Sequence, residues 1–308
     1  MVSAKKFKKR ILIIIAIFFA FCVVSMAATK IIYDNIFARY DKPANIPESL
    51  SSMVQGRQVC QFPSGKNQLT GYYYAPEKDA HGLIVFVPGF CAGGDDYLWQ
   101  ISELRDLGWA VFTFDPTGTL RSEGKNQVGF SQTIIDLEAA LKYVEKSERF
   151  GYNELVLVGH SRGAYAACCL LEQDHDVAAV VSISGVNSAM EAVMEMSTDA
   201  IGAISYGNYG FLWLYQAMLF GTDTLEMEAA EAISEGDVPV LVVHGTNDEK
   251  FPVSSSSIIS YKEKLSSAQV EYLLCDAGHT DIMYDPDGTA NNALIQDVHQ
   301  FLLRSIGE

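Results

Sequence analysis

Basic residues are scarce along most of this chain. The sequence of 308 residues has 22 Lys and Arg against 38 Asp and Glu, which gives a net charge of −16 at pH 7. Five of the basic residues lie within residues 5–10, so the remainder has 17 basic residues against 38 acidic ones, a net charge of −21. Because so acidic a surface repels phosphate backbones, we expect no nucleic-acid partner.

Cysteines are also few, and no two of them have the spacing of zinc ligands. One of the six, Cys22, lies in an apolar segment, which leaves an odd number in the rest of the chain. A domain of this size needs no disulfide bonds, so we expect buried free thiols. Internal repeats and low-complexity runs are absent from the sequence. The remaining five cysteines are Cys60, Cys91, Cys168, Cys169 and Cys275.

Apolar residues, in contrast, are abundant, and one long uncharged run lies near the start of the chain. They make up 49% of the sequence, which is enough for a large core and argues against disorder. The basic residues 5–10 are followed by 18 uncharged residues, 11–28. Secretory signals usually have about 7–15 apolar residues, whereas a membrane-spanning helix needs about 17–25.

We therefore expect residues 1–28 to form an uncleaved signal anchor, a single transmembrane helix. Its basic end would stay in the cytoplasm, and the rest of the chain would lie on the extracytoplasmic side of the cell membrane. Ser25-Met26-Ala27 resembles a cleavage site, so a secreted product is the alternative. Residues 29–54 contain two prolines and a Ser-rich stretch without clear periodicity. We interpret them as a spacer that lifts the domain off the bilayer, partly helical over 31–38.

Residues 55–308 alternate between strand-like and helix-like segments. Regular alternation predicts an α/β fold, with a mostly parallel sheet flanked by helices on both faces. The first two strands should pair antiparallel around a turn at 63–67. We expect strands at 57–62, 69–75, 82–87, 109–114, 155–158, 177–183, 238–243 and 270–274, and helices at 96–107, 131–147, 162–173, 253–265 and 289–303.

One segment, residues 187–235, interrupts this alternation. It is about fifty residues long, has no expected strand and is rich in aromatic residues. Long excursions from compact domains are often lids or binding elements. We expect a small helical cap, some of whose apolar side chains face the site below it.

The most informative motif is Gly159-His160-Ser161-Arg162-Gly163, which directly follows the strand expected at 155–158. A Gly-x-Ser-x-Gly turn between a strand and a helix exposes its serine at the carboxyl end of a sheet. Side chains at 159 and 163 would collide with the neighbouring strand and helix, which accounts for the two glycines. We predict Ser161 as a catalytic nucleophile; a glycine-rich turn with an idle serine is the alternative.

A serine hydroxyl is a weak nucleophile until a base takes its proton, and that base must be oriented by a third group. His279 follows the strand expected at 270–274, at the same edge of the sheet as Ser161. The other five histidines lie inside the elbow, at strand entrances, in a second strand-ending turn or on a helix. Asp248 follows the strand expected at 238–243, and the order Ser161, Asp248, His279 is the one expected for this architecture. Glu249 is the rival acid.

A tetrahedral intermediate also needs backbone N–H donors around its oxyanion. The N–H of Arg162, directly after the nucleophile, is one expected donor. The N–H of Phe90, directly after Pro88-Gly89, is the second, and Cys91 is the alternative donor in that loop. Glycines 93 and 94 would let the loop curl over the site.

From residue 57 to the end, the chain resembles the α/β-hydrolase superfamily. The resemblance implies acyl transfer to water through a covalent serine intermediate, with neither a metal nor an organic cofactor, and it does not fix the substrate. It rests on five landmarks in order: Pro88-Gly89-Phe90, Asp115-Pro116-Thr117-Gly118, Gly159-His160-Ser161-Arg162-Gly163, Asp248 and His279.

The second landmark suggests a branch within that superfamily. Residues 115–124 resemble the Asp-x-x-Gly-x-Gly-x-Ser segment of the monoglyceride-lipase-like and S33-peptidase-like members. The sequence departs from that pattern, because Leu120-Arg121 replaces the second glycine and Pro88 stands where many members have histidine.

Three classes of function are compatible with these residues. The first is a membrane-tethered serine hydrolase of carboxylic esters, acting on small or lipid-like substrates, which the aromatic cap and the apolar anchor favour. The second is a peptidase or amidase, which would use cap carboxylates such as Glu191, Glu195 and Asp199 to hold a substrate amine. The third is a non-catalytic binding module, against which a complete Ser-His-Asp set argues. Nothing in the sequence identifies protein partners.

Overall fold

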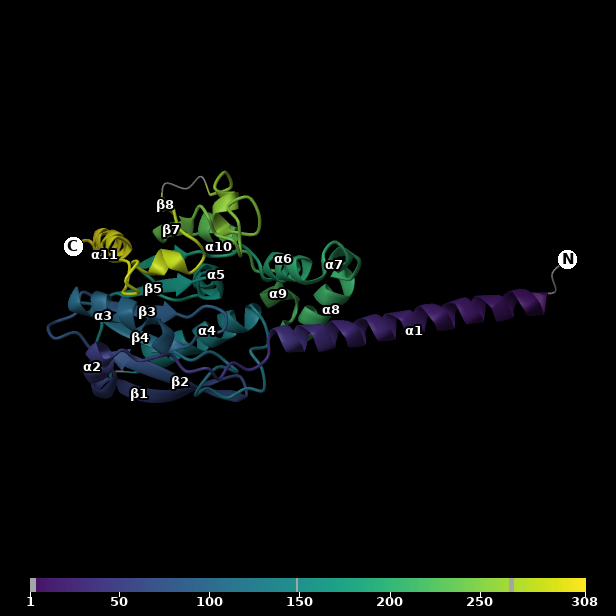
Figure 1. The fold of residues 1–308 in the computed structure, drawn as a ribbon, viewed down its shortest axis with the longest axis horizontal. Helices are drawn as coiled ribbons and strands as arrows, with labels where there is room; N and C mark the ends of the chain where they lie inside the picture. The colour runs from purple at the N-terminus through teal and green to yellow at the C-terminus, as the bar shows by residue number, and fades with distance from the viewer. Residues whose placement is uncertain (1–3, 148, 266–268) are drawn as a thin grey trace.

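The computed structural model describes residues 4–147, 149–265 and 269–308. Within these residues an eight-stranded sheet forms the body, in the order β1-β2-β4-β3-β5-β6-β7-β8 (Figure 1). β1 pairs with β2 and β2 with β4 in the antiparallel sense, and the other pairs are parallel. The expected α/β class with a mostly parallel sheet is therefore confirmed. The strands are β1 Gln58–Ser64, β2 Asn67–Tyr74, β3 Leu83–Val87, β4 Ala110–Phe114, β5 Leu155–His160, β6 Ala179–Ile183, β7 Val240–Gly245 and β8 Val270–Cys275.

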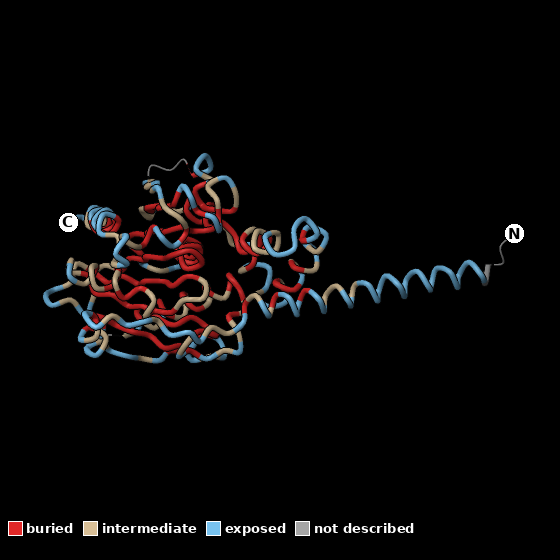
Figure 2. The backbone as a smooth tube through the Cα atoms, in the orientation of Figure 1, coloured by how far each residue is buried: buried red, intermediate tan, exposed pale blue. Residues whose placement is uncertain are grey.

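Helices cover both faces of this sheet. They are α2 Ser51–Gly56, α3 Leu98–Asp106, α4 Ser131–Glu145, α5 Arg162–Cys169, α10 Ala229–Glu235 and α11 Asn292–Ile306. Successive side chains of a strand point to opposite faces, so β3 places Val85 in one core cluster and Ile84 in the other. Side chains of α4, α5 and α10 complete the first cluster, and those of α3 and α11 complete the second. The inner strands β3 to β7 are consequently buried between two helical layers, whereas the edge strands β1 and β8 are partly exposed (Figure 2).

A cap of four helices lies between β6 and β7, within the segment where the sequence predicts one. The helices are α6 Ala189–Ile201, α7 Ile204–Gly207, α8 Tyr209–Phe220 and α9 Thr222–Leu225. The next helix, α10, returns to the body and packs on α5, so residues 229–235 belong to the layer over the sheet and not to the cap. Short 3₁₀ helices complete the described elements at Glu48–Leu50, Gly94–Tyr97, Leu170–Glu172, Ile258–Tyr261 and Asp281–Met283.

The first helix, α1 Ala4–Ile36, projects from the body next to the cap (Figure 1). Its segment Lys6–Ile36 has a mean hydropathy of 3.0 in its most apolar window and is long enough to cross a membrane. The helix does not stop at residue 28. Its last turns pack against α8, where Thr29 and Tyr33 are buried, and Phe37 beyond its end is buried too.

Two expected segments differ from the structure. Residues 29–54 are not a free spacer, because Tyr33, Phe37 and Leu50 are buried in the body. The expected helix at 253–265 is wrong as well: only the 3₁₀ turn Ile258–Tyr261 forms there. The Ser255 and Ser257 hydroxyls donate to the Pro252 carbonyl at 3.0 and 3.1 Å, and such local side-chain hydrogen bonds compete with helix formation.

The six cysteines are all described, and all are free. Burial, expected for the five outside the apolar segment, is found only for Cys168 and Cys169. Cys60, Cys91 and Cys275 are partly exposed, and Cys91 lines the largest of the pockets described below.

Candidate active site

The predicted nucleophile, Ser161, stands on a strained turn between β5 and α5. Its φ of 55° and ψ of −120° are rare for a residue with a side chain, and its N–H donates to the Ile183 carbonyl of β6 at 2.8 Å. The turn lifts the side chain above the carboxyl end of the sheet, at the N-terminus of α5. Ser161 is only 4% exposed, so the hydroxyl lies inside the molecule and not on its surface.

Both glycines of the elbow are required by close backbone contacts. A Cβ atom at Gly159 would lie 2.5 Å from the backbone of Gly163, and one at Gly163 would lie 2.1 Å from the Val87 carbonyl oxygen of β3. Backbone atoms cannot move aside as the end of a flexible side chain can. The two glycines therefore let the strand, the turn and the helix approach closely.

We expect Gly163→Ala to lower the free energy of unfolding by at least about 3 kcal/mol, because overpacking against backbone has no easy relief. Gly56→Ala is the matched control, since a Cβ there meets nothing within 4 Å. Its effect should be neutral or slightly stabilising. Thermal unfolding monitored by circular dichroism measures both variants, and equal midpoints would contradict this account of the elbow.

The structure brings Ser161, His279 and Asp248 together. His279 Nε2 lies 2.9 Å from Ser161 Oγ, and His279 Nδ1 lies 2.7 Å from Asp248 Oδ2. Both distances are those of hydrogen bonds. The three side chains come from the ends of three different strands, β5, β7 and β8, as their positions in the sequence predict.

Asp248 is held by more than the imidazole. Its Oδ1 accepts the N–H groups of Lys250 and Phe251, each at 2.9 Å, and its side chain is fully buried. Burial raises the pKa of Asp248, but the hydrogen bond with His279 and the N–H of Phe251 outweigh it and leave the pKa below its ordinary value. The carboxylate is therefore ionised at neutral pH and fixes the proton of His279 on Nδ1.

The rival acid, Glu249, occupies a different position. Its Oε2 accepts the backbone N–H of His279 at 3.3 Å and does not contact the imidazole. A second histidine, His244, lies on the other side of Asp248, with Nε2 3.4 Å from Oδ2 and 2.9 Å from the Phe251 carbonyl oxygen. The sequence pattern indicates no role for His244, because its contact with Asp248 depends on a turn that brings residues 244, 248 and 251 together.

The two expected oxyanion donors are unoccupied. Among the residues that the structure describes, the N–H groups of Phe90 and Arg162 have no hydrogen-bond partner. The N–H of Cys91, the alternative donor, is used by the Gln127 side-chain oxygen at 3.2 Å. Glycine is required at residue 93 of this loop, because a Cβ there would lie 2.4 Å from Asp115 Oδ1.

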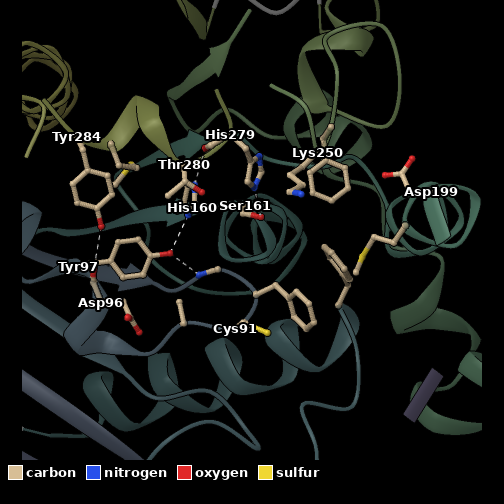
Figure 3. Close-up of a pocket in the computed structure, with 17 residues that line it drawn as sticks. Cys91, Asp96, Tyr97, His160, Ser161, Asp199, Lys250, His279, Thr280 and Tyr284 are labelled. Carbon is tan, nitrogen blue, oxygen red and sulfur yellow. Dashed lines mark hydrogen bonds between the residues drawn. The ribbon is translucent and has the colours of Figure 1, made fainter. Parts of the chain in front are cut away.

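A cavity of about 580 Å³ opens above Ser161 and His279 (Figure 3). Its walls are mostly apolar. Polar groups gather at two sides: Asp96, Tyr97 and Tyr284 at one, and Asp199 of α6 at the other. Over the described ranges, no three or more His, Cys, Asp and Glu side chains are grouped to hold a metal ion. The apolar walls are formed chiefly by Phe90, Phe130, Met196, Phe251 and Met283.

Comparisons with known proteins agree with this geometry. A family model described as the alpha/beta hydrolase fold matches residues 82–221. An esterase of Pyrococcus furiosus superposes with a TM-score of 0.67 at 17% identity, covering 88% of this chain and 100% of the esterase. The chain has the α/β-hydrolase fold. The resemblance found in the sequence is thereby confirmed for the fold and is consistent with the superfamily, while the branch stays a prediction.

Other α/β-hydrolase structures are similar to the same extent. Est1E from Butyrivibrio proteoclasticus, with ferulic acid bound, has a TM-score of 0.61 at 16% identity and covers 81% of this chain and 100% of its own. An acylaminoacyl peptidase of Pyrococcus horikoshii has a TM-score of 0.61 at 17% identity, covering 87% of this chain and 44% of the peptidase. The search of curated proteins found no match. Identities this low show the fold and leave the substrate open.

Within this fold, hydrogen bonds connect the loop of Gly89 and Phe90 to His279. The Gly89 N–H donates to the Tyr97 hydroxyl at 3.0 Å, which lies 2.9 Å from His160 Nδ1, and His160 Nε2 lies 3.1 Å from the His279 carbonyl oxygen. A carbonyl only accepts, so His160 donates from Nε2 and its Nδ1 accepts the Tyr97 proton. The network fixes both the loop and the backbone of His279 (Figure 3).

His160 must stay neutral for this arrangement to hold. Burial, and then the charge of His279, lower the pKa of His160 to about 4. Sequence analysis placed His160 inside the elbow and gave it no role. The partner Tyr97 lies 63 residues away in the sequence, so no local pattern links the two.

We expect His160 to make folding pH-dependent. In the unfolded chain this histidine has a pKa near 6.5 and is protonated below that pH, whereas in the folded protein His160 is protonated only near pH 4. The stability that His160 contributes therefore falls as the pH drops from 6.5 to 4. The difference in free energy of unfolding between the unchanged protein and His160→Asn should therefore shrink from pH 6.5 to 4, measured by urea unfolding in detergent.

His175 provides a control of opposite sign. Burial lowers its pKa, but the hydrogen bonds with Glu138 and Glu145 outweigh burial and raise the pKa above the ordinary value. The stability lost in His175→Asn should therefore decline as the pH rises above 6.5. A pH-independent difference for His160→Asn would show that His160 is not held neutral.

Proposed function

We propose that this protein is a membrane-tethered serine hydrolase that cleaves carboxylic esters through an acyl-enzyme on Ser161. The observation that carries the proposal is the hydrogen-bonded series from Ser161 Oγ through the His279 imidazole to the Asp248 carboxylate, 2.9 and 2.7 Å in length. It lies at the floor of a cavity next to two free N–H groups. A nucleophile, a base, an orienting acid and oxyanion donors are the parts that acyl transfer needs.

In the proposed reaction, Ser161 Oγ attacks the ester carbonyl while His279 Nε2 takes the hydroxyl proton. The negative charge that develops on the carbonyl oxygen is stabilised by the N–H groups of Phe90 and Arg162. His279 then gives its proton to the leaving alcohol, and the acyl group remains on Ser161. A water molecule then attacks the acyl group while His279 takes a proton from it. His279 gives this proton to Ser161 Oγ as the carboxylic acid leaves. Asp248 keeps the imidazole oriented and stabilises its positive charge throughout.

The lining of the cavity favours an apolar acyl group. Phenylalanine and methionine side chains form most of its walls, and such walls hold acyl chains by burial of apolar area. Two of the three cap carboxylates already have partners. Glu191 bonds to the Tyr261 hydroxyl, and Glu195 accepts the hydroxyls of Ser255 and Ser256. Neither carboxylate lines the cavity above Ser161, whereas Asp199 does.

A peptidase is the second candidate, and one observation favours it. Asp199 lines the cavity across from Tyr97, where it could pair with the amino group of a substrate. The acylaminoacyl peptidase among the similar structures has the same fold. One carboxylate at the edge of an apolar cavity is weaker support for a peptidase than the apolar walls are for an esterase.

The proposed tether is α1. Its residues 6–20 are exposed along the whole helix surface in the structure, and they include many large apolar side chains. Such a surface is unsuited to water and suited to lipid. We place its basic end in the cytoplasm and the catalytic body on the extracytoplasmic side. Cleavage near residues 25–27 and secretion is the alternative.

A substrate panel tests the proposal. We expect p-nitrophenyl esters of increasing chain length to be hydrolysed, aminoacyl-anilides to be hydrolysed far more slowly, and both activities to vanish in Ser161→Ala. The anilides being the better substrates would favour the peptidase. Hydrolysis of neither class, with a correctly folded protein, would favour the binding module.

A further inference from the structure

The cap carries an unusual concentration of exposed apolar side chains. Beyond α1, the described residues include ten large hydrophobic side chains that are exposed, and seven of these lie within residues 201–219. Ile204 is 79% exposed, Met218 is 72% exposed and Tyr206 is 67% exposed. We call these seven the cap face: Ile201, Ile204, Tyr206, Tyr209, Leu214, Met218 and Leu219.

The same segment is without charge in a strongly acidic protein. No Asp, Glu, Lys or Arg occurs from residue 200 to residue 222, although the chain has 38 acidic residues. The 12-residue helix α8 is apolar around most of its circumference, yet only Leu212, Tyr215 and Gln216 are buried. A helix that is apolar all round is normally buried in protein or in lipid. Exposure of this face to water is therefore unfavourable, which indicates that an apolar partner covers it.

Contacts with α1 determine where the cap face would lie. Phe21 of α1 packs edge-on against Phe211 of α8, with ring centroids 6.1 Å apart. Farther along α1, the Asn208 side chain donates to the Thr29 hydroxyl at 2.8 Å, and the Tyr33 hydroxyl donates to Gln216 at 3.1 Å. The cap thus packs along the part of α1 that leaves the body, on the side from which the helix projects (Figure 1, Figure 2).

These contacts set the depth of the cap relative to the uncharged segment 11–28. An α-helix rises about 1.5 Å per residue, so that segment is about 27 Å long, close to the hydrocarbon core of a bilayer. Phe21 precedes residue 28 by seven positions and would lie about 10 Å inside the outer edge of that core. Phe211, which contacts Phe21, would lie at the same depth. Helices that rest in the membrane interface are buried to about 5–10 Å.

The aromatic residues and a second cavity agree with this placement. Tyr206 and Tyr209 are exposed on the cap face, and tyrosine is enriched at the boundary of membranes with water. A groove of about 500 Å³ is lined on one part by Met194, Tyr206 and Tyr209 and on another by the carboxylates Glu191, Glu195 and Asp199. Asp199 lines the cavity of Ser161 as well, so the groove and that cavity adjoin.

We propose that the cap face rests in the outer leaflet of the bilayer that α1 spans, and that the ester enters the Ser161 cavity from that leaflet. The inference depends on the proposed function for its anchor and its substrate class. Its occupant is lipid, because α8, which carries four of the seven residues of the cap face, packs on the apolar part of α1 through the contact of Phe21 with Phe211. The anchor and the cap would together hold the catalytic body at one fixed depth.

Fluorescence quenching by lipid tests the placement independently of activity. The full chain is reconstituted into phosphatidylcholine vesicles with or without brominated acyl chains, and co-flotation verifies insertion. Ile204→Trp adds a fluorophore on the cap face, and Val59→Trp adds one on β1, where the exposure is 52%. Relative to the unsubstituted protein, the signal added at position 204 should fall about twofold or more in brominated lipid, and the signal added at position 59 should not change.

Kinetics test the route of entry. The double variant Ile204→Glu, Met218→Glu should lower kcat/KM about tenfold or more for a long-chain ester carried in vesicles and leave kcat/KM for a water-soluble p-nitrophenyl ester unchanged. The control variant Val59→Glu, Leu274→Glu changes two exposed apolar residues outside the cap and should alter neither value. Equal losses for both esters, or no loss for the vesicle ester, would overturn the proposed route.

The outcomes separate this inference from the function on which it depends. A chain that inserts and hydrolyses the soluble ester, but is not quenched at position 204, overturns the inference and leaves the hydrolase intact. A chain that is quenched at position 204 and hydrolyses neither ester supports the cap placement and overturns the hydrolase. A detergent-solubilised dimer that Ile204→Glu converts to a monomer would make the cap face an interface between copies, and the inference would be wrong.

Discussion

Ser161→Ala should reduce ester turnover by about 10⁶-fold, to the level that the cavity and the oxyanion donors sustain without a nucleophile. The size of the effect follows from the role: without Oγ no acyl-enzyme forms, and the His279 imidazole has no hydroxyl to deprotonate. Initial rates on the best p-nitrophenyl ester, with the variant at high concentration, measure it.

Folding must be separated from chemistry in that experiment. Ser161 is held by backbone contacts at a strained φ, and within the described part of the chain its side chain bonds to His279 alone, so alanine should leave the fold intact. Unchanged thermal unfolding and an unchanged circular dichroism spectrum are the controls. A well-folded Ser161→Ala that retains a tenth of the activity would exclude Ser161 as the nucleophile.

Asp248→Asn should lower kcat by about 10⁴-fold with little change in KM. An amide at this position can donate a hydrogen bond to Nδ1, which places the imidazole proton on Nε2. A protonated Nε2 cannot accept the proton of Ser161. The ionised carboxylate, whose pKa is held below its ordinary value, prevents this in the unchanged protein.

Glu249→Gln is the matched control for Asp248→Asn. Both substitutions replace a neighbouring carboxylate by its amide, but Glu249 bonds to the backbone N–H of His279 and not to its imidazole, and a glutamine oxygen can still accept that bond. We expect kcat close to that of the unchanged protein. A large loss in Glu249→Gln together with a small loss in Asp248→Asn would exchange the assignments of the two acids.

Much of the body could be predicted from the sequence because parallel strands buried on both faces are continuous apolar runs. The run before Gly159 and the run before His244 are such strands, and each is followed directly by the turn that carries a candidate site residue. The elbow could be predicted because its two glycines are required by close backbone contacts within the turn and with β3. The meeting of Ser161, Asp248 and His279 follows from the common edge of the sheet.

Other features depend on packing that a local pattern does not record. Tyr33 is buried against Tyr215 of α8, and Phe37 is buried against Phe90 and Phe130 of the body. These partners are distant in the sequence, so no local pattern marks the two residues as core. The segment 253–265 has apolar residues at helical spacing, but its serines bond to nearby carbonyls. The contact of His160 with Tyr97 joins the end of β5 to a 3₁₀ helix 63 residues away in the sequence. The Gln127 side chain that occupies the N–H of Cys91 is likewise 36 residues away.

The helix α1 and the residues just after it connect the cap to the loop that carries Phe90. The helix contacts α8 along residues 21–34, and Phe37 beyond its end packs on Phe90 of the oxyanion loop, with ring centroids 5.3 Å apart. The proposed anchor is therefore continuous with the wall of the catalytic cavity.

The central claim is that Ser161 becomes acylated, and covalent trapping tests it most directly. The full chain is treated with a fluorophosphonate in detergent, digested, and analysed by peptide mass spectrometry. The account predicts one adduct, on the peptide that contains residues 159–163, localised to Ser161 and lost in Ser161→Ala. An unlabelled Ser161 in a folded protein that still hydrolyses esters, or an adduct that persists in Ser161→Ala, would contradict it.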